Sequence, residues 1–166
     1  MQDKLKENAC RNRGYVLDGY PKTFENAEHS FLELPPKYDE EGELIEPEEP
    51  ELEEGEKKDF SEYIPDTKIF PKSCILLTGS DEALIERVKE LPEEALEGTR
   101  YNMEEMNKRI KKYREANNSV IAEPSVQKFF EERDVSVFTE SMDTAVSQAF
   151  DSFEIFIERV SKHNIS

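Results

Sequence analysis

Asp18 and Lys22 are the residues of this chain whose types and spacing best suit phosphate chemistry. They follow directly on an apolar run at residues 14–17 and are separated by the tripeptide G-Y-P. A carboxylate beyond the end of a buried strand can hold a metal-bound water, and an ammonium one short turn later can meet an anionic phosphate. A second interpretation stays open, in which Asp18 belongs to a simple turn and Lys22 is a solvated surface charge.

The elements that would position these residues are predicted from apolar periodicity and turn formers. Short apolar runs predict three buried strands, at residues 14–17, 73–78 and 135–139. Helical spacing and capping residues predict helices at 2–9, from Thr23 to before Pro35, after Ser80, from Asn102, at 125–132 and over 142–162. The alternation of strands and helices predicts an α/β fold with a parallel sheet of about three strands, flanked by helices.

Most of the negative charge lies in one segment, residues 33–58. It contains twelve acidic residues and three lysines, a net charge of −9 out of −17 for the whole chain. This low-complexity sequence contains too few apolar side chains for their burial to offset the entropic cost of ordering its backbone. The segment is therefore predicted to be a disordered or loosely attached loop.

Composition argues against several classes of function. A net charge of −17 repels nucleic acid and anionic lipid, so neither is expected as a partner. Cys10 and Cys74 lack C-x-x-C spacing, and His29 and His163 are far from both, so neither a zinc site nor a disulfide framework is expected. No secretory signal or membrane-spanning run occurs, which favours a soluble, cytoplasmic protein.

The first motif lies in the stretch LKENACRNRGYVLDGYPKTFENA, which resembles a segment of the adenylate kinases. There a helix and a strand lead into a D-G-[FY]-P-[RK]-T motif that contacts the nucleoside monophosphate. The resemblance continues in DEALIERV, in GTRYNMEEMNKRIKKYRE, which is similar to the arm that closes the lid, and in VSVFTES, which is similar to the last strand. It covers most of the chain outside the acidic segment and implies a P-loop-kinase-like fold, with a cis peptide bond before Pro21.

The resemblance also implies a reaction and a set of site residues. The reaction is ATP + AMP to 2 ADP, with Mg²⁺ entering as the ATP complex. The resemblance implies that Asp18 binds Mg²⁺ through a water molecule, that Lys22 contacts the AMP phosphate and that Asn26 contacts the adenine. It further implies that Arg87 lies against the ATP base, and that Arg100 and Arg109 contact the charge of the migrating phosphoryl group.

Several features depart from the family pattern. The phosphate-cradling loop G-x-x-x-x-G-K-[ST] does not occur in these residues, so no phosphoryl donor is positioned. Lys22 stands where the family usually has arginine, and its ammonium cannot form the two parallel hydrogen bonds to a phosphate that a guanidinium forms. Asn26 stands where the family usually has glutamine, and its side chain is one methylene shorter. For Arg109, which lies among lysines, a solvated helix charge is an equally good interpretation.

We therefore predict a single incomplete domain over residues 1–166, with an acidic insert at 33–58 and a shortened lid at 91–98. The missing loop implies a missing central strand, which an upstream segment or a neighbouring subunit would supply, unless the two flanking strands pair directly. Within the family, the insert and short lid most resemble a long, cilium-associated isoform. Two hypotheses follow: a nucleotide kinase domain that is inactive as this isolated chain, or a non-catalytic module of a ciliary axoneme or another large assembly.

Overall fold

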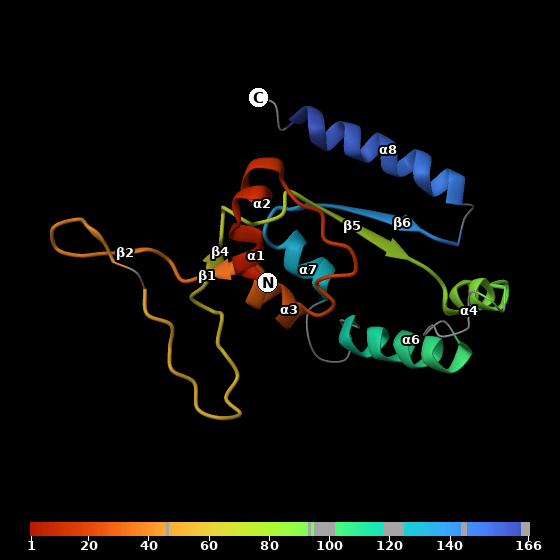
Figure 1. The fold of residues 1–166 in the computed structure, drawn as a ribbon, viewed down its shortest axis with the longest axis horizontal. Helices are drawn as coiled ribbons and strands as arrows, with labels where there is room; N and C mark the ends of the chain where they lie inside the picture. The colour runs from red at the N-terminus through yellow and green to blue at the C-terminus, as the bar shows by residue number, and fades with distance from the viewer. Residues whose placement is uncertain (46, 93, 95–101, 118–124, 144–145, 164–166) are drawn as a thin grey trace. The chain divides into compact units, whose positions relative to one another are not determined.

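The computed structural model divides the chain into two compact units, residues 1–70 and residues 71–166 (Figure 1). It describes residues 1–45, 47–92, 94, 102–117, 125–143 and 146–163. The prediction of one incomplete domain over the whole chain stays a prediction.

The first unit contains three helices and two short antiparallel ladders. The helices are α1 (Gln2–Lys6), α2 (Asn8–Arg13) and α3 (Phe24–Phe31), so the predicted helix at 2–9 is instead two helices interrupted at Glu7, whose backbone is extended. The ladders pair β1 (Leu32–Glu33) with β4 (Ile64–Pro65) and β2 (Lys37–Tyr38) with β3 (Leu44–Ile45).

Residues 14–17 do not form the buried strand that their apolar side chains predict. The side chain of Val16 is 93% exposed, whereas Tyr15 is half-buried and its hydroxyl donates to the carbonyl of Ile69. The described ladders of this unit are β1–β4 and β2–β3, so no strand lies beside residues 14–17 to accept and donate their hydrogen bonds. The prediction was wrong because a buried strand needs such a partner.

The core of the first unit gathers residues from its two ends. Its buried apolar side chains are Leu5, Ala27, Phe31, Leu32 and Ile69. Phe31 also packs edge-to-face on Phe70, with ring centroids 6.0 Å apart. The helix that carries the first motif, α3, is thereby fixed against the segment that follows the acidic insert.

The second unit is an α/β layer built on one parallel ladder. Strands β5 (Ser73–Thr78) and β6 (Ser136–Ser141) pair in register over their full lengths, as two of the three predicted strands. Its described residues include the helices α4 (Asp81–Lys89), α6 (Met103–Asn117), α7 (Val126–Glu131) and α8 (Val146–His163). The mixed α/β class is confirmed, with a two-stranded parallel sheet among the described residues in place of about three strands.

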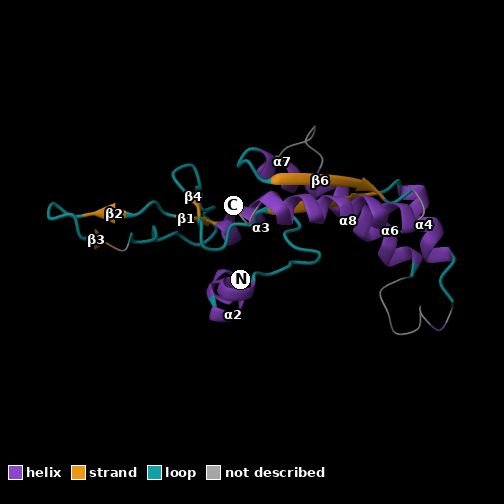
Figure 2. Cartoon of the chain, turned by 90° about the horizontal axis from the view of Figure 1, so that it is seen from above, coloured by secondary structure: helices purple, strands orange, loops and turns teal. Residues whose placement is uncertain are grey.

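Helix α8 packs along β6, as the two ribbon views show (Figures 1 and 2). Phe138 of β6 and Phe156 of α8 stack with ring centroids 4.8 Å apart, and Ala149 of α8 is buried. Phe129 and Phe130 of α7 are also buried and meet edge-to-face. Among the helices of the described residues, none is long and apolar enough to cross a membrane.

Candidate functional site

The motif at residues 18–26 is a tight connection pinned to helix α3. Gly19 has φ +66°, a conformation that favours glycine, and the Tyr20–Pro21 peptide is cis, which confirms the expectation from the resemblance. Thr23 caps α3, because its Oγ1 accepts from the backbone N–H of Asn26 at 3.1 Å. The Tyr20 hydroxyl lies 2.7 Å from Ser30 Oγ, so the turn is tied to the buried side of the helix.

The three predicted site residues of this motif lie on one short segment. Asp18 and Lys22 are exposed, on either side of the cis peptide, and Asn26 is half-buried in the first turn of α3. The Asn26 carbonyl also accepts from the Tyr20 hydroxyl at 3.3 Å. The motif therefore carries an exposed carboxylate, an exposed ammonium and a half-buried amide on one short segment, and of these the ammonium could meet an anionic phosphate. Their individual roles stay predictions.

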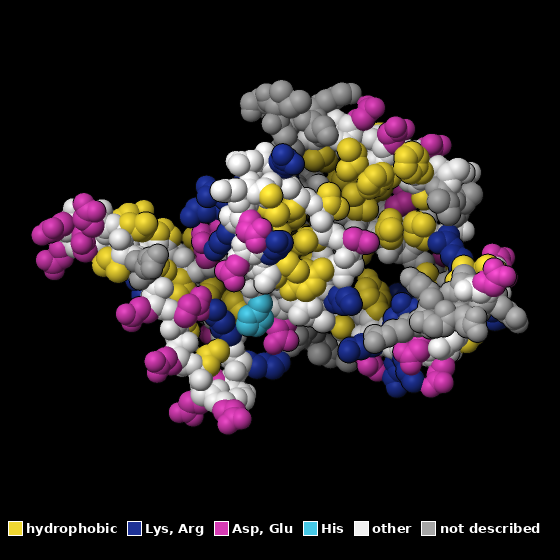
Figure 3. Space-filling model, viewed as in Figure 1, with side chains coloured by type: hydrophobic (Ala, Val, Ile, Leu, Met, Phe, Trp, Pro, Cys, Tyr) yellow, Lys and Arg dark blue, Asp and Glu magenta, His cyan; other side chains and the backbone are white. Residues whose placement is uncertain are grey.

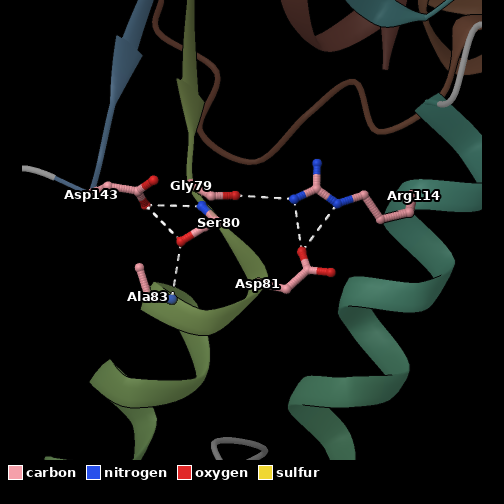
Figure 4. A network of polar contacts seen from close by, with 6 residues as sticks. All are labelled: Gly79, Ser80, Asp81, Ala83, Arg114 and Asp143. Atoms are coloured by element: carbon pink, nitrogen blue, oxygen red, sulfur yellow. Dashed lines mark hydrogen bonds and ion pairs between the residues drawn. The ribbon is translucent and has the colours of Figure 1, made fainter.

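The carboxyl ends of β5 and β6 form a second polar cluster, in the other unit (Figure 4). Ser80 caps α4 as predicted, with its Oγ accepting from Ala83 N at 3.2 Å. Asp143, just beyond β6, accepts through Oδ1 from Ser80 N at 2.9 Å and from Ser80 Oγ at 3.3 Å. The N-terminus of α4, where free N–H groups would favour an anion, is thus occupied by the chain's own carboxylate.

Arg114 of α6 braces the same loop. Its Nε and Nη2 donate to Asp81 Oδ1 at 3.1 and 2.7 Å, and Nη2 also donates to the carbonyl of Gly79 at 3.0 Å (Figure 4). The hydrogen bond with Asp81 raises the pKa of the Arg114 guanidinium. Both side chains are about half exposed, so the pair orients α6 against α4 more than it stabilises the fold.

Arg87 reaches the loop after β6. The Arg87 guanidinium donates to the carbonyl of Met142, whose own N–H donates to Thr78 O at 2.7 Å. Arg109 is exposed on α6 and lies 3.9 Å from Met106 Sδ. Arg100 lies outside the described residues, as does most of the predicted lid at 91–98.

Three structurally important residues were missed by reasoning from the sequence: Asp66, Arg114 and Asp143. Asp143 follows the end of a predicted strand, and the rule that loops at the carboxyl ends of parallel strands meet could have found it. Arg114 lies in a cluster of basic residues that gave no sign of which one contacts α4. Asp66 is fully buried and pairs with Lys6 at 2.8 Å, a contact between distant parts of the chain that no local pattern signals.

The chain matches none of the known protein-family models and none of the solved structures. It is similar to two curated proteins, both called adenylate kinase 7. The protein from Macaca fascicularis is 35% identical over 136 residues, which is 81% of this chain and 22% of that protein. The protein from Mus musculus is 33% identical over 135 residues, or 81% of this chain and 19% of that protein. The chain thus spans about a fifth of the length of these relatives.

Proposed function

Because this chain is related to the adenylate kinase family over 81% of its residues, we propose that it forms the nucleotide-contacting part of an adenylate-kinase-like domain. The reaction of the completed domain is phosphoryl transfer from ATP to AMP, which gives 2 ADP. The isolated chain does not catalyse this reaction, since its 166 residues contain no phosphate loop.

The observation that carries the proposal is the hydrogen bonding of residues 18–26. The Thr23 cap on α3 and the contact between the Tyr20 hydroxyl and Ser30 hold the connection that resembles the family's monophosphate-contacting motif. On this connection, Lys22 would attract the AMP phosphate as a point charge, and Asn26 would hydrogen-bond the adenine.

Magnesium would enter with ATP rather than bind to a preformed protein site. Among the described residues there is no group of three or more carboxylate, histidine or cysteine side chains that could hold a metal ion. Asp18 is an exposed carboxylate and would hold the ion through one of its waters, while substrate phosphates supply the remaining oxygen ligands. The bound ion would neutralise charge on the transferred phosphoryl group.

The cluster at the ends of β5 and β6 supports a base-binding role and not a phosphate-binding one. Asp143 already accepts the N–H and hydroxyl of Ser80, so a phosphate at the N-terminus of α4 would meet a carboxylate. Arg87, held at the Met142 carbonyl, would place its planar guanidinium against the ATP base. Arg100 and Arg109 would meet the charge of the migrating phosphoryl group.

The phosphate loop and the central strand would then come from outside the present residues. The 93% exposure of Val16, in an apolar segment without a ladder partner in the described part of the first unit, supports this requirement. An upstream segment of a longer protein, or a neighbouring subunit, would pair with residues 14–17 and place its loop beside Lys22.

The alternative is a non-catalytic adenylate-kinase-like module in a ciliary axoneme or another large cytoplasmic assembly. The absence of a phosphate loop from the sequence and the extended acidic segment favour this function. In that case the fold and its acidic insert serve protein contacts, and the residues of the first motif need not bind nucleotide.

Two measurements on the 166-residue chain separate these proposals. A coupled-enzyme assay with ATP and AMP should show no ADP formation, and appreciable turnover would overturn the requirement for an added phosphate loop. NMR titration with AMP should shift resonances of residues 18–26, and Lys22→Ala should weaken binding by about tenfold because a charge-assisted hydrogen bond is lost. Lys37→Ala, which removes an exposed lysine outside the motif, is the matched control. Absence of AMP binding would favour the non-catalytic module.

A further inference from the structure

The acidic segment contains a short hairpin and several side-chain contacts. We call residues 34–63, which connect β1 to β4, the acidic arm. Within it, residues 37–56 contain eleven carboxylates and one lysine, a net charge of −10. The antiparallel pairing of Leu32 with Pro65 and of Glu33 with Ile64 closes the base of the arm. The two ends of the arm therefore lie side by side at the β1–β4 ladder.

Aromatic and charged side chains contact one another in the second half of the arm, at residues 49–63. Lys58 pairs with Glu49, and its ammonium lies 4.7 Å from the ring centroid of Tyr63 and 5.3 Å from that of Phe60. The Tyr63 hydroxyl donates to Glu49 Oε2 at 2.9 Å. Phe60 in turn meets His29 of α3 edge-to-face, with centroids 4.8 Å apart. These contacts attach the arm to the helix that carries the first motif.

The hairpin of the arm has a turn specified by its own residues. Asp39 Oδ1 accepts from the backbone N–H groups of Glu41 and Glu43 at 2.9 and 2.8 Å. The Asp39 N–H donates to Glu43 O at 3.0 Å, and Gly42 adopts φ +85°, which favours glycine. The turn between β2 and β3 is thus set before any partner binds, which lowers the entropic cost of presenting it.

The hairpin exposes large apolar side chains next to its acidic tip. Tyr38 and Leu44 are directly opposite in the ladder and so share one face, where they are 63% and 64% exposed. Ile45, on the other face, is 47% exposed. Figure 3 shows acidic side chains gathered at the tip of the arm with hydrophobic ones directly behind them. A hairpin whose strands are two residues long gains little stability in water from an apolar face that stays exposed. An exposed apolar face beside charged residues is instead typical of a protein interface.

The charge of the arm decides what can cover this face. A second copy of the chain brings another net charge of −17 and is repelled, as are nucleic acid and an anionic membrane surface. A cationic protein segment gains from both features, since its charge is attracted to the tip and its apolar side chains cover Tyr38 and Leu44. We propose that the acidic arm docks a Lys/Arg-rich protein segment that carries large apolar side chains, whether or not the completed domain is an active kinase.

Two synthetic peptides of equal charge test the proposal with the 166-residue chain. Both are twelve residues long with six lysines; the remaining positions are serine in one, and two of them are leucine in the other. Fluorescence anisotropy should give about tenfold tighter binding of the leucine peptide, from apolar area buried on the hairpin. Raising the salt concentration should weaken both complexes, because the charge attraction is screened.

Variants then locate the binding surface. Tyr38→Ser combined with Leu44→Ser should reduce the affinity for the leucine peptide to that for the serine peptide. Leu52→Ser, at a residue of the same arm that is 45% exposed but outside the hairpin, is the matched control and should leave it unchanged. Equal affinity of the native chain for both peptides, or no effect of the paired serine substitutions, overturns the proposal. Sedimentation that shows dimers lost in the same double variant overturns it in favour of a second copy.

Discussion

Replacing Lys6 with methionine should destabilise residues 1–70, because it leaves the Asp66 carboxylate buried without its cation. Asp66 has no exposed side-chain area, and its Oδ2 lies 2.8 Å from Lys6 Nζ. Burial by itself would raise the pKa of Asp66, but the hydrogen bond from Lys6 and the backbone N–H of Lys68 hold it below its ordinary value of 3.8. The hydrogen bond with Asp66 likewise raises the pKa of Lys6 above 10.5.

The size of the effect follows from how far water reaches the pair. Removing one partner of a fully buried ion pair costs about 3–5 kcal/mol. The Lys6 side chain is 39% exposed, so solvent screening reduces this to about 1–3 kcal/mol. The lowered pKa of Asp66 makes its contribution present above its unfolded-state pKa and lost as the pH falls through its folded-state pKa. The raised pKa of Lys6 makes its contribution present below 10.5 and lost as the pH rises through its folded-state pKa.

Hydrogen–deuterium exchange with mass spectrometry can localise the loss, since it follows peptides from α3 and from residues 64–70 separately. At pH 7 these peptides should open with a free energy lower by about 1–3 kcal/mol in Lys6→Met. The matched control is Lys4→Met, which removes an exposed pair with Glu7 and should cost less than about 0.5 kcal/mol. Equal protection in the two variants, or a loss just as large at pH 3 as at pH 7, would refute the role of the Lys6–Asp66 pair.

Two further substitutions test the electrostatics and the capping of the two units. Burial and the neighbouring Asp66 charge raise the pKa of Glu33, so its ionised form costs stability above its folded-state pKa. Glu33→Gln should therefore stabilise the first unit at pH 7 in urea unfolding, and a gain that persists below the ordinary pKa of 4.5 would contradict this explanation. Ser80→Ala should cost about 1 kcal/mol and accelerate amide exchange at the start of α4, because the cap to Ala83 N is lost; unchanged exchange there would show that the Asp143 contact suffices.

Turns and caps could be predicted from the sequence because neighbouring residues decide them. Thr23 and Ser80 cap the helices that follow them, as the local pattern predicts, whereas the cis Tyr20–Pro21 bond was expected from the family resemblance. The caps need few contacts from distant parts of the chain, so a local pattern contains most of the information. The apolar runs of β5 and β6 likewise predict strands, but their parallel pairing joins distant parts of the chain, Ser73 with Ser136 through Thr78 with Ser141.

Features that depend on distant partners could not be predicted. The run at residues 14–17 has the composition of a buried strand, but burial also needs a neighbouring strand, and none is present in the described first unit. The hairpin of the acidic arm escaped prediction for the opposite reason: its composition indicates disorder, yet the Asp39 side chain organises its turn. Nothing in the sequence around Asp66 distinguishes it from the many other acidic residues of the chain. Its buried carboxylate pairs with Lys6, which lies 60 residues earlier.

The negative charge of the chain determines which groups a segment that completes the kinase site would have to supply. Asp143 occupies the N-terminus of α4, the insert carries a large negative charge, and the chain as a whole carries −17. ATP and AMP would add further negative charge, which Lys22 and Arg87 alone cannot balance. In the proposed kinase, the phosphates therefore need Mg²⁺ and the backbone N–H groups and lysine of a phosphate loop. A strand that merely paired with residues 14–17 would satisfy the backbone of that run without completing the site, so a partner that lacks the phosphate loop would leave the domain inactive.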